Sequence, residues 1–207
     1  MPISMPARLQ IRLDRGGMDG ATGRYEKRLS ELTDLYRDAA AHVTALKRLG
    51  DPIVYAVEDF RPSAATGDLI FGITRMAAGK IGDEFYLTRG HIHAKADRPE
   101  VYHGQAGRGL MLMESPEGET RVVEIAPNAV CYVPPYWIHR SINVGSEDLV
   151  MAFSYPADAG QDYGIIARSN GMQKRVLDDG QGGWMLVDNT AYRPRSVAEI
   201  DALLATA

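Results

Sequence analysis

The chain lacks several features that would assign it to a specialised class of protein. It has one cysteine, Cys131, so no disulfide can form within it. No apolar run approaches the length of about eighteen residues that a membrane-spanning helix needs, and the first residues lack the apolar segment of a secretory signal. Basic residues are not in excess, with 23 Lys and Arg against 27 Asp and Glu, which argues against nucleic-acid or membrane-surface binding. These absences predict a protein of the reducing cytoplasm.

The amino-terminal part of the chain predicts one helix. Apolar residues recur at helical spacing from residue 29 to residue 49, and Gly50, followed by Asp51-Pro52, ends the pattern. The glycine-rich residues 16–20 before it indicate a turn or loop. We therefore expect residues 1–51 to form a helical extension that packs on the rest of the protein.

After Pro52 the chain turns to short segments rich in Val, Ile, Tyr and Phe, which are separated by Gly, Pro, Asp and Asn. Many short strands with turn signals between them indicate an all-β sandwich or barrel. The expected strands are residues 53–57, 69–76, 84–87, 100–103, 109–114, 121–125, 130–133 and 148–154.

The carboxyl-terminal part of the chain is mixed. Residues 174–177 and 183–187 predict a hairpin. Ser196 and Glu199 have the spacing of a capping box, which predicts a helix that begins at Val197, within residues 191–207. No repeat, low-complexity tract or linker interrupts the chain, so we expect one domain over residues 52–190 between the two helical ends.

Histidine and glutamate residues gather in the strand-rich middle of the chain. His91 and His93 are two positions apart, so in an extended segment both imidazoles point to the same face. Glu100 and His139 follow further along the chain. Three imidazoles and one carboxylate suit a borderline divalent metal such as Fe, Mn, Ni, Co or Zn, and leave coordination positions open to a substrate or water. Two histidines alone would be a weak signal, so the residues around them matter.

The spacing of residues around these ligands resembles the two motifs of the cupin superfamily, whose fold is a double-stranded β-helix barrel of the jelly-roll type. The residues that carry the resemblance are Glu100, Gly107, Asn128, Pro134, His139 and Asn143. Two departures are visible. Asn128 stands where the second motif usually opens with glycine, and the gap from His93 to Glu100 is longer than is common. Neither departure changes the type of a ligand.

Longer stretches around the same residues resemble one cupin family, the cupin-type glucose-6-phosphate isomerases. The stretches are TRGHIHAKADRPEVY at residues 88–102, VPPYWIHRSIN at 133–143, YPADAGQDYG at 155–164 and VDN at 187–189. The resemblance covers roughly residues 52–190 and leaves the first fifty residues and the last helix outside it. It implies a cytoplasmic, homodimeric, metal-dependent enzyme of glycolysis and gluconeogenesis, with a small sugar phosphate as its partner and neither nucleic acid nor membrane.

The resemblance also implies roles for individual residues. The implied metal ligands are His91, His93, Glu100 and His139. The implied ion is one divalent metal per subunit, Fe²⁺ first, with Mn²⁺, Ni²⁺ or Zn²⁺ as alternatives. The positions that match the family's substrate pocket are Thr74, Thr88, Gly90, Tyr102, Tyr136 and Tyr155. Gln161 lies in the same pocket where the family often has a histidine, and because glutamine can only hydrogen-bond, it cannot move a proton.

Isomerisation between glucose 6-phosphate and fructose 6-phosphate moves a hydrogen between C1 and C2 of the sugar and a proton between their oxygens. In a proton-transfer route, a divalent ion stabilises the negative charge on those oxygens. Glu100 is then both a metal ligand and the candidate base, and Tyr155 is the second candidate catalytic residue. In a metal-assisted hydride shift, Glu100 would move only hydroxyl protons. The sequence leaves both routes open.

Other conspicuous residues favour structural roles. We expect His42 to be exposed on the amino-terminal helix. His103 has the opposite strand parity to Tyr102, so it should point away from the metal. Cys131 and Trp137 are expected to be a core side chain and part of the barrel wall.

Three rival functions stay open, because cupins carry several activities. A metal-dependent dioxygenase acting on a small organic acid or thiol would use the same four ligands, but it would not account for residues 155–164 or the two threonines. A non-catalytic module would bind a hexose phosphate without turnover. The nearest rival is an isomerase of another sugar phosphate, such as mannose 6-phosphate.

Overall fold

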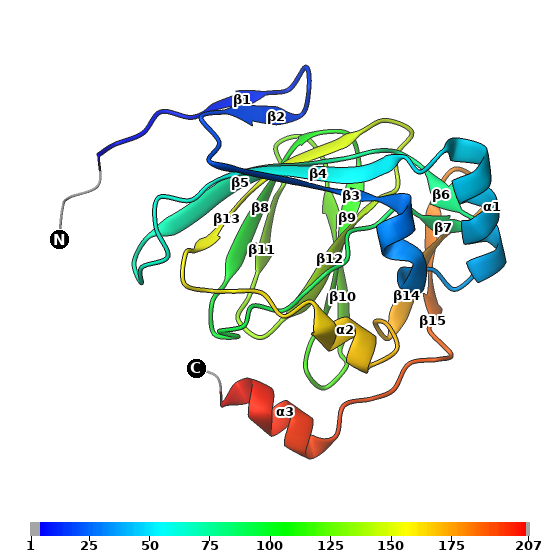
Figure 1. The fold of residues 1–207 in the computed structure, drawn as a ribbon. Coiled ribbons are helices and arrows are strands. Elements are labelled where there is room, and N and C mark those ends of the chain that lie inside the picture. Colours follow the sequence, from blue (N-terminus) through cyan, green and yellow to red (C-terminus); the bar gives the residue numbers. More distant parts are fainter. Residues whose placement is uncertain (1–4, 206–207) are drawn as a thin grey trace.

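The barrel is built from two antiparallel sheets that share one hydrophobic core (Figure 1). The computed structural model describes residues 5–205. The large sheet contains β3 (Gly23–Arg28), β4 (Ile53–Phe60), β5 (Leu69–Met76), β8 (Glu100–Ala106), β11 (Val130–Val133) and β13 (Leu149–Pro156). These strands lie in the spatial order β11-β8-β13-β5-β4-β3.

The small sheet of the barrel contains β9 (Gly109–Glu114), β10 (Thr120–Ile125) and β12 (Ile138–Asn143), with β9 in the centre. Every residue of β9 and β12 is buried, so both faces of these strands are covered by the rest of the protein. Leu110 and Ile142 from this sheet join Met76 from the large sheet in the core. Burial of each such side chain contributes about 1.5–3 kcal/mol. The predicted all-β cupin barrel with flanking helices is confirmed.

Two smaller sheets complete the structure. One contains β6 (Lys80–Ile81), β7 (Glu84–Phe85), β14 (Lys174–Asp178) and β15 (Trp184–Asp188), in the order β15-β14-β7-β6. The hairpin predicted at residues 174–177 and 183–187 is therefore confirmed as β14 and β15. The other sheet is the hairpin of β1 (Gln10–Arg12) and β2 (Gly17–Asp19), which the sequence predicted only as a turn.

All eight strands predicted between residues 53 and 154 are present, and β5, β9 and β11 have the predicted bounds. Two strands were missed in this region, the two-residue β6 and the longer β12. The sequence of β12, IHRSIN, has no alternating apolar pattern, because polar side chains are buried at four of its six positions. That burial is a first sign that β12 has a role beyond packing.

The prediction of a single helix over residues 29–49 is wrong. The chain forms a 3-10 helix, η1 (Leu29–Leu35), and then α1 (Ala39–Leu49). Between them the backbone of Tyr36 is extended, and the Asp38 side chain accepts a hydrogen bond of 2.8 Å from an amide in the first turn of α1. Aspartate is a strong N-cap residue, so α1 begins there.

The amino-terminal part also contains a strand that joins the barrel. β3 pairs with β4, with Tyr25 opposite Val57, so these residues are part of the large sheet and not only of a helical extension. The division of the chain at residues 51 and 190 remains a prediction.

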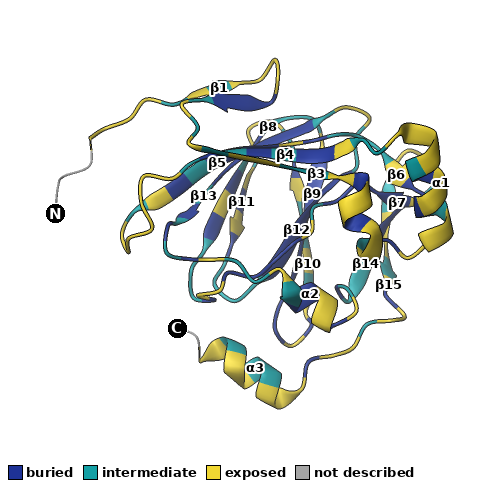
Figure 2. Cartoon of the chain, in the orientation of Figure 1, coloured by how far each residue is buried: buried dark blue, intermediate teal, exposed yellow. Residues whose placement is uncertain are grey.

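The prediction that His42 is exposed is also wrong. Most of α1 is exposed (Figure 2), but His42 is fully buried. Its Nε2 lies 2.9 Å from the Leu29 carbonyl oxygen, and its ring stacks on that of Tyr36. The break between η1 and α1 lets η1 lie against the helix and cover this histidine.

Two further helices follow the barrel strands, α2 (Gly164–Arg168) and α3 (Val197–Leu204). The predicted capping box of α3 is confirmed, because the side chains of Ser196 and Glu199 each accept the other's amide proton. Within residues 5–205, no helix is both long and apolar enough to cross a membrane.

Candidate metal centre

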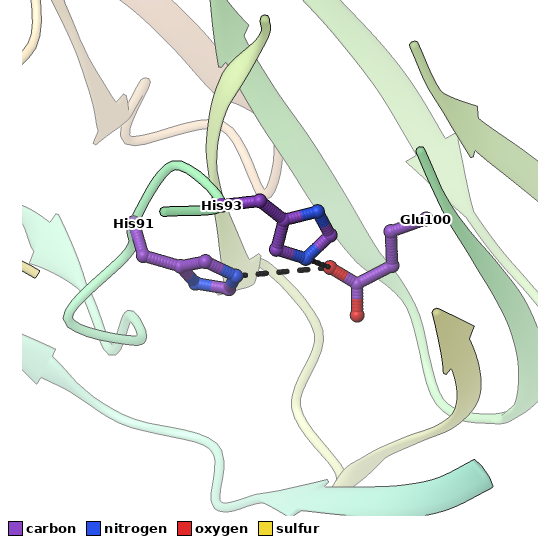
Figure 3. A group of neighbouring side chains, drawn as sticks. All are labelled: His91, His93 and Glu100. Carbon is purple, nitrogen blue, oxygen red and sulfur yellow. Dashed lines mark ion pairs between the residues drawn. The ribbon is translucent and has the colours of Figure 1, made fainter. Parts of the chain in front are cut away.

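Three separate segments bring the proposed metal ligands together. His91 and His93 lie on the irregular segment before β8, Glu100 begins β8, and His139 lies on β12. Backbone hydrogen bonds run in both directions between His91 and His139, at 2.9 and 3.0 Å, and hold the first segment against β12. The imidazoles of His91 and His93 both point to the Glu100 carboxylate (Figure 3). All four side chains are buried.

The donor atoms have the spacing of ligands to a single ion. The Nε2 atoms of the three histidines lie 3.7 Å (His91), 3.4 Å (His93) and 3.0 Å (His139) from Oε2 of Glu100. Two ligands at right angles, each about 2.1 Å from an ion, are about 3.0 Å apart. The donor atoms of His91, His93 and Glu100 all lie within 4.8 Å of one another, so small shifts would let these three groups bind one ion. His139 contacts the same carboxylate oxygen but falls outside this set of mutually close atoms.

Backbone carbonyls orient two of the imidazoles. Nδ1 of His93 lies 2.7 Å from the Arg98 carbonyl oxygen, and Nδ1 of His139 lies 3.1 Å from that of Trp137. Because a carbonyl only accepts, each Nδ1 carries the proton, and the Nε2 lone pair is left for a metal. Nε2 of His93 is buried and has no hydrogen-bond partner among the described residues, as expected of an atom whose partner is an ion.

The electrostatics of the site favour the charge states that bind metal. Burial raises the pKa of Glu100, but the surrounding imidazoles of His139, His93 and His91 outweigh it and hold this pKa well below its usual range. Burial lowers the pKa of His91 well below its usual value, and His139 lowers it further. The carboxylate is therefore ionised and the His91 imidazole is neutral, as in a metal site.

A cavity, here called the metal cavity, opens beside three of these ligands, His91, Glu100 and His139. Its free volume of about 50 Å³ is room for a few water molecules. Hydroxyl groups dominate the wall. They belong to Tyr25, Tyr55, Thr74, Thr88, Tyr102, Ser141, Tyr155 and Tyr163.

Several known proteins resemble this chain. The model of the glucose-6-phosphate isomerase (GPI) family matches residues 26–193. The chain belongs to this family. A curated glucose-6-phosphate isomerase of Sinorhizobium medicae is 57% identical over 96% of this chain and 92% of its own length. That of Thermococcus kodakarensis is 42% identical over 93% of this chain and 100% of its own. A solved oxalate oxidase with the substrate analogue glycolate has a TM-score of 0.45 and 17% identity, over 53% of this chain and 55% of that one.

The predicted isomerase identity is confirmed, but the predicted extent of the resemblance is wrong. The family match begins at residue 26, and the Sinorhizobium relative aligns with almost the whole chain, whereas the first fifty residues were expected to lie outside. The pairing of β3 with β4 accounts for this difference, because it makes the amino-terminal residues part of the barrel.

The structure brings most of the predicted isomerase pocket together. The predicted residues that line the metal cavity are Thr74, Thr88, Gly90, Tyr102, Tyr155 and Gln161, with the ligands His91, Glu100 and His139. His93 is not among the residues that line the cavity. Tyr136 does not line the cavity either; it packs against the core on the loop before β12, and its amide donates to the Ala96 carbonyl.

Gly90 is needed for the close packing of this pocket. Its φ of +74° is in the left-handed region, and a Cβ there would lie 2.7 Å from the Ile166 side chain and 2.9 Å from that of Arg140. Only glycine therefore lets the backbone between Thr88 and His91 approach β12 and line the cavity.

Gln161 lies beside the ligands and is part of a small polar chain. Its Nε2 is 3.5 Å from Nε2 of His91, and the Tyr163 hydroxyl donates to its Oε1. These two hydrogen-bonded side chains link the loop after β13 to the metal centre. Because neither the amide nor the phenol has a pKa near neutrality here, Gln161 and Tyr163 position groups and do not relay protons.

Several residues of the metal cavity were not predicted from the sequence. The main ones are Tyr25, Tyr55, Asp59, Arg61, Arg140 and Tyr163. Tyr163 and Arg140 lie inside the stretches that resemble the isomerases, so the resemblance of the residues around them could have identified them as pocket residues. Tyr25, Tyr55, Asp59 and Arg61 come from β3, β4 and the residue after β4, and only strand pairing brings them to the site.

Proposed function

We propose that the chain interconverts glucose 6-phosphate and fructose 6-phosphate at this centre. The observation that carries the proposal is the convergence of three imidazoles on one buried carboxylate, in a chain that belongs to the glucose-6-phosphate isomerase family. The activity named for the curated relatives supports it. Family membership favours this function over a dioxygenase and over a non-catalytic sugar-phosphate-binding cupin.

The cofactor in this proposal is one divalent ion per subunit, held by His91, His93, Glu100 and His139. We assign Fe²⁺ first, with Mn²⁺, Ni²⁺ and Zn²⁺ as alternatives, because imidazole and carboxylate ligands suit all four ions. When bound, such an ion supplies electrophilic stabilisation of the charge that develops on the sugar oxygens.

Glu100 is the base in the proposed reaction. Its low pKa keeps it ionised. Oε2 faces the imidazoles, whereas the other carboxylate oxygen points away from them (Figure 3) and would take a proton from the sugar. The same carboxylate would carry the proton between C1 and C2 on one face of the substrate. If the hydrogen instead moves as a hydride, Glu100 serves only the hydroxyl protons.

The phosphate group of the substrate would meet neutral donors. The proposed contacts are the hydroxyls of Thr74, Thr88 and Tyr155 and the backbone of Gly90. Burial is the main cause that raises the pKa of Tyr155 to about 12, so this phenol stays protonated and can donate. Hydrogen bonds to an anion are stronger than those between neutral groups, so such a set can hold a phosphate without a cluster of lysines.

Substrate entry requires side chains at the rim of the metal cavity to move, because the free volume is smaller than a sugar phosphate. Tyr25 and Tyr163 line the cavity and are each 39% exposed. Rotamer changes of exposed side chains on binding are common and cost little. We assign the opening motion to these two tyrosines.

A homodimer in the cytoplasm completes the proposal. β11 lies at the edge of the large sheet, and its Val130 and Tyr132 side chains are 62% and 54% exposed. An apolar sheet edge is a template for pairing with another chain, and a two-fold dimer would cover it. Sedimentation should give the mass of two chains, and Tyr132→Glu should shift the species toward one chain.

The test of this function is an assay of fructose 6-phosphate conversion on metal-stripped protein with each divalent ion added back. We expect activity to return with a metal and to be absent in His139→Ala. Turnover should proceed without oxygen. Binding of the sugar phosphate without turnover would indicate that the protein is a non-catalytic binding module. Turnover of mannose 6-phosphate alone would change the substrate, and oxygen consumption would indicate the dioxygenase.

A further inference from the structure

A second cavity, here called the arginine cavity, lies on the other side of Arg140 from the metal cavity. Its free volume is about 600 Å³, within the range of small-molecule sites. It lies between η1, β7, β12, α2 and β14. Arg140 and Tyr163 line both cavities, so the two sites share part of a wall.

Two arginines face the arginine cavity without a carboxylate partner among residues 5–205. Arg140 is 6% exposed; its Nη2 donates to the Arg89 carbonyl at 2.7 Å, and its buried Nε has no hydrogen-bond partner. The Arg89 guanidinium is exposed, and its hydrogen bond within residues 5–205 is a long contact, 3.4 Å, to the carbonyl oxygen of Glu31. A buried guanidinium without a counter-charge is costly, so an anion from outside the chain would stabilise this arrangement.

The other charged residues of this cavity are already neutralised or exposed. Arg175 pairs with Glu84 at 2.7 Å, and Lys174 pairs with Asp188 at 2.6 Å. Asp34 is exposed. The cations left over are therefore Arg89 and Arg140, and the cavity carries excess positive charge at one end.

Buried apolar side chains also line the cavity and are here called its apolar wall. They include Leu87, Ile142, Met172 and Val176. A ligand that fits would have an anionic head at the two arginines and a short carbon body against this wall. Phosphate oxygens match the planar fork of an arginine and accept several hydrogen bonds at once.

We propose that the arginine cavity binds a small organic phosphate at a site distinct from that of the substrate. The ligand's phosphate contacts Arg89 and Arg140, and its carbon body packs on the apolar wall. Because Arg140 and Tyr163 also line the metal cavity, occupancy of this site alters the shape of the substrate pocket. The inference does not rest on the proposed isomerase reaction, since binding alone tests it.

The test is calorimetric titration of the metal-loaded full chain with glycerol 3-phosphate, and with inorganic phosphate as a probe of the head group. Arg89→Gln should weaken binding of both by about tenfold or more, since it removes a charge-assisted contact. Ala191→Trp places a large ring at the exposed rim of the cavity and should weaken glycerol 3-phosphate binding as strongly. Arg121→Gln is the matched control, because Arg121 is 63% exposed, pairs with Glu119 and lines neither cavity.

The outcomes separate this site from the substrate pocket. Equal affinity in the wild type and in Ala191→Trp would place the phosphate in the metal cavity and overturn the proposal. If the wild type did not bind glycerol 3-phosphate at all, the proposal would also be overturned. Melting temperatures of both variants within a few degrees of the control ensure that lost binding reflects the site. If Arg89→Gln does not fold, Ala191→Trp decides alone.

Discussion

The tight, hydroxyl-lined metal cavity is bordered by two imidazoles and the Glu100 carboxylate, whereas the arginine cavity of about 600 Å³ is lined by two arginines and an apolar wall. Arg140 lines both cavities. The first site holds its own negative charge, Glu100, beside the neutral imidazole of His91, and Nε2 of His93 is an unsatisfied nitrogen there. The unsatisfied atom of the second site is a guanidinium donor. The first site therefore calls for a cation and the second for an anion. The partner that each buried polar group lacks therefore determines which kind of ion each of the two adjacent cavities would bind.

The largest effect is expected at the centre of the metal cavity. Glu100→Gln keeps the size of the side chain but removes both the negative charge and the base. We expect turnover to fall by about a thousandfold or more, while the metal content falls only in part, because three imidazoles remain. Turnover and bound metal are measured on the same sample. Full metal with normal turnover would mean that Glu100 is not the base.

The difference between a buried arginine with an ion-pair partner and one without can be tested by measuring the stability of two variants. Arg195 pairs with fully buried Glu114 at 2.7 Å, whereas Arg140 pairs with no carboxylate among the described residues. Arg195→Met leaves a buried anion, so we expect a loss of about 3–5 kcal/mol and a melting temperature lower by roughly 10 °C. Arg140→Met removes an uncompensated charge, so its melting temperature should change by only a few degrees.

Thermal melts of these two variants and the wild type at neutral pH give the comparison directly. A large loss of stability in Arg140→Met would show that its guanidinium is well compensated in the free protein. The arginine cavity would then have no need of an anion.

A smaller effect is expected from the polar chain that borders the metal centre. Gln161→Ala removes the contacts to His91 and Tyr163 but leaves the ligands and Glu100 in place. We expect kcat/KM to fall less than tenfold, because glutamine orients groups and transfers no proton. Steady-state kinetics across pH would show an unchanged profile. A hundredfold loss or a shifted profile would assign Gln161 a larger part in the reaction.

The metal ligands could be predicted because their geometry is local. In an extended segment His91 and His93 reach one side, and the spacing to Glu100 and His139 follows a known pattern. Tyr136 belongs to the same stretch as His139, but its backbone φ is +72° and its amide is hydrogen-bonded to Ala96. Its side chain therefore packs against the core and not in the cavity. A backbone turn of this kind leaves no signal in residue spacing.

The rest of the site depends on contacts between distant parts of the chain. Tyr25 reaches the metal cavity because β3 pairs with β4, and His42 is buried because the chain breaks at Tyr36. Arg140 was overlooked because it follows a ligand in a strand without apolar alternation. Propensity and periodicity describe one segment at a time, whereas these positions are set by register and packing between segments.

The smallest effect is expected at α3, which lies outside the barrel (Figure 1). Hydrogen bonds from Arg193, and then from the Ser196 amide, lower the pKa of Glu199 to about 2 from an ordinary value near 4.5. Since the folded-state pKa is lower than the unfolded one, this carboxylate stabilises the protein fully above about pH 4.5. The contribution is lost as the pH falls toward about 2. Glu199→Gln should therefore melt slightly below the wild type at pH 6, and the difference should vanish near pH 2. A difference that persists at low pH would assign the effect to packing of the helix end and not to charge.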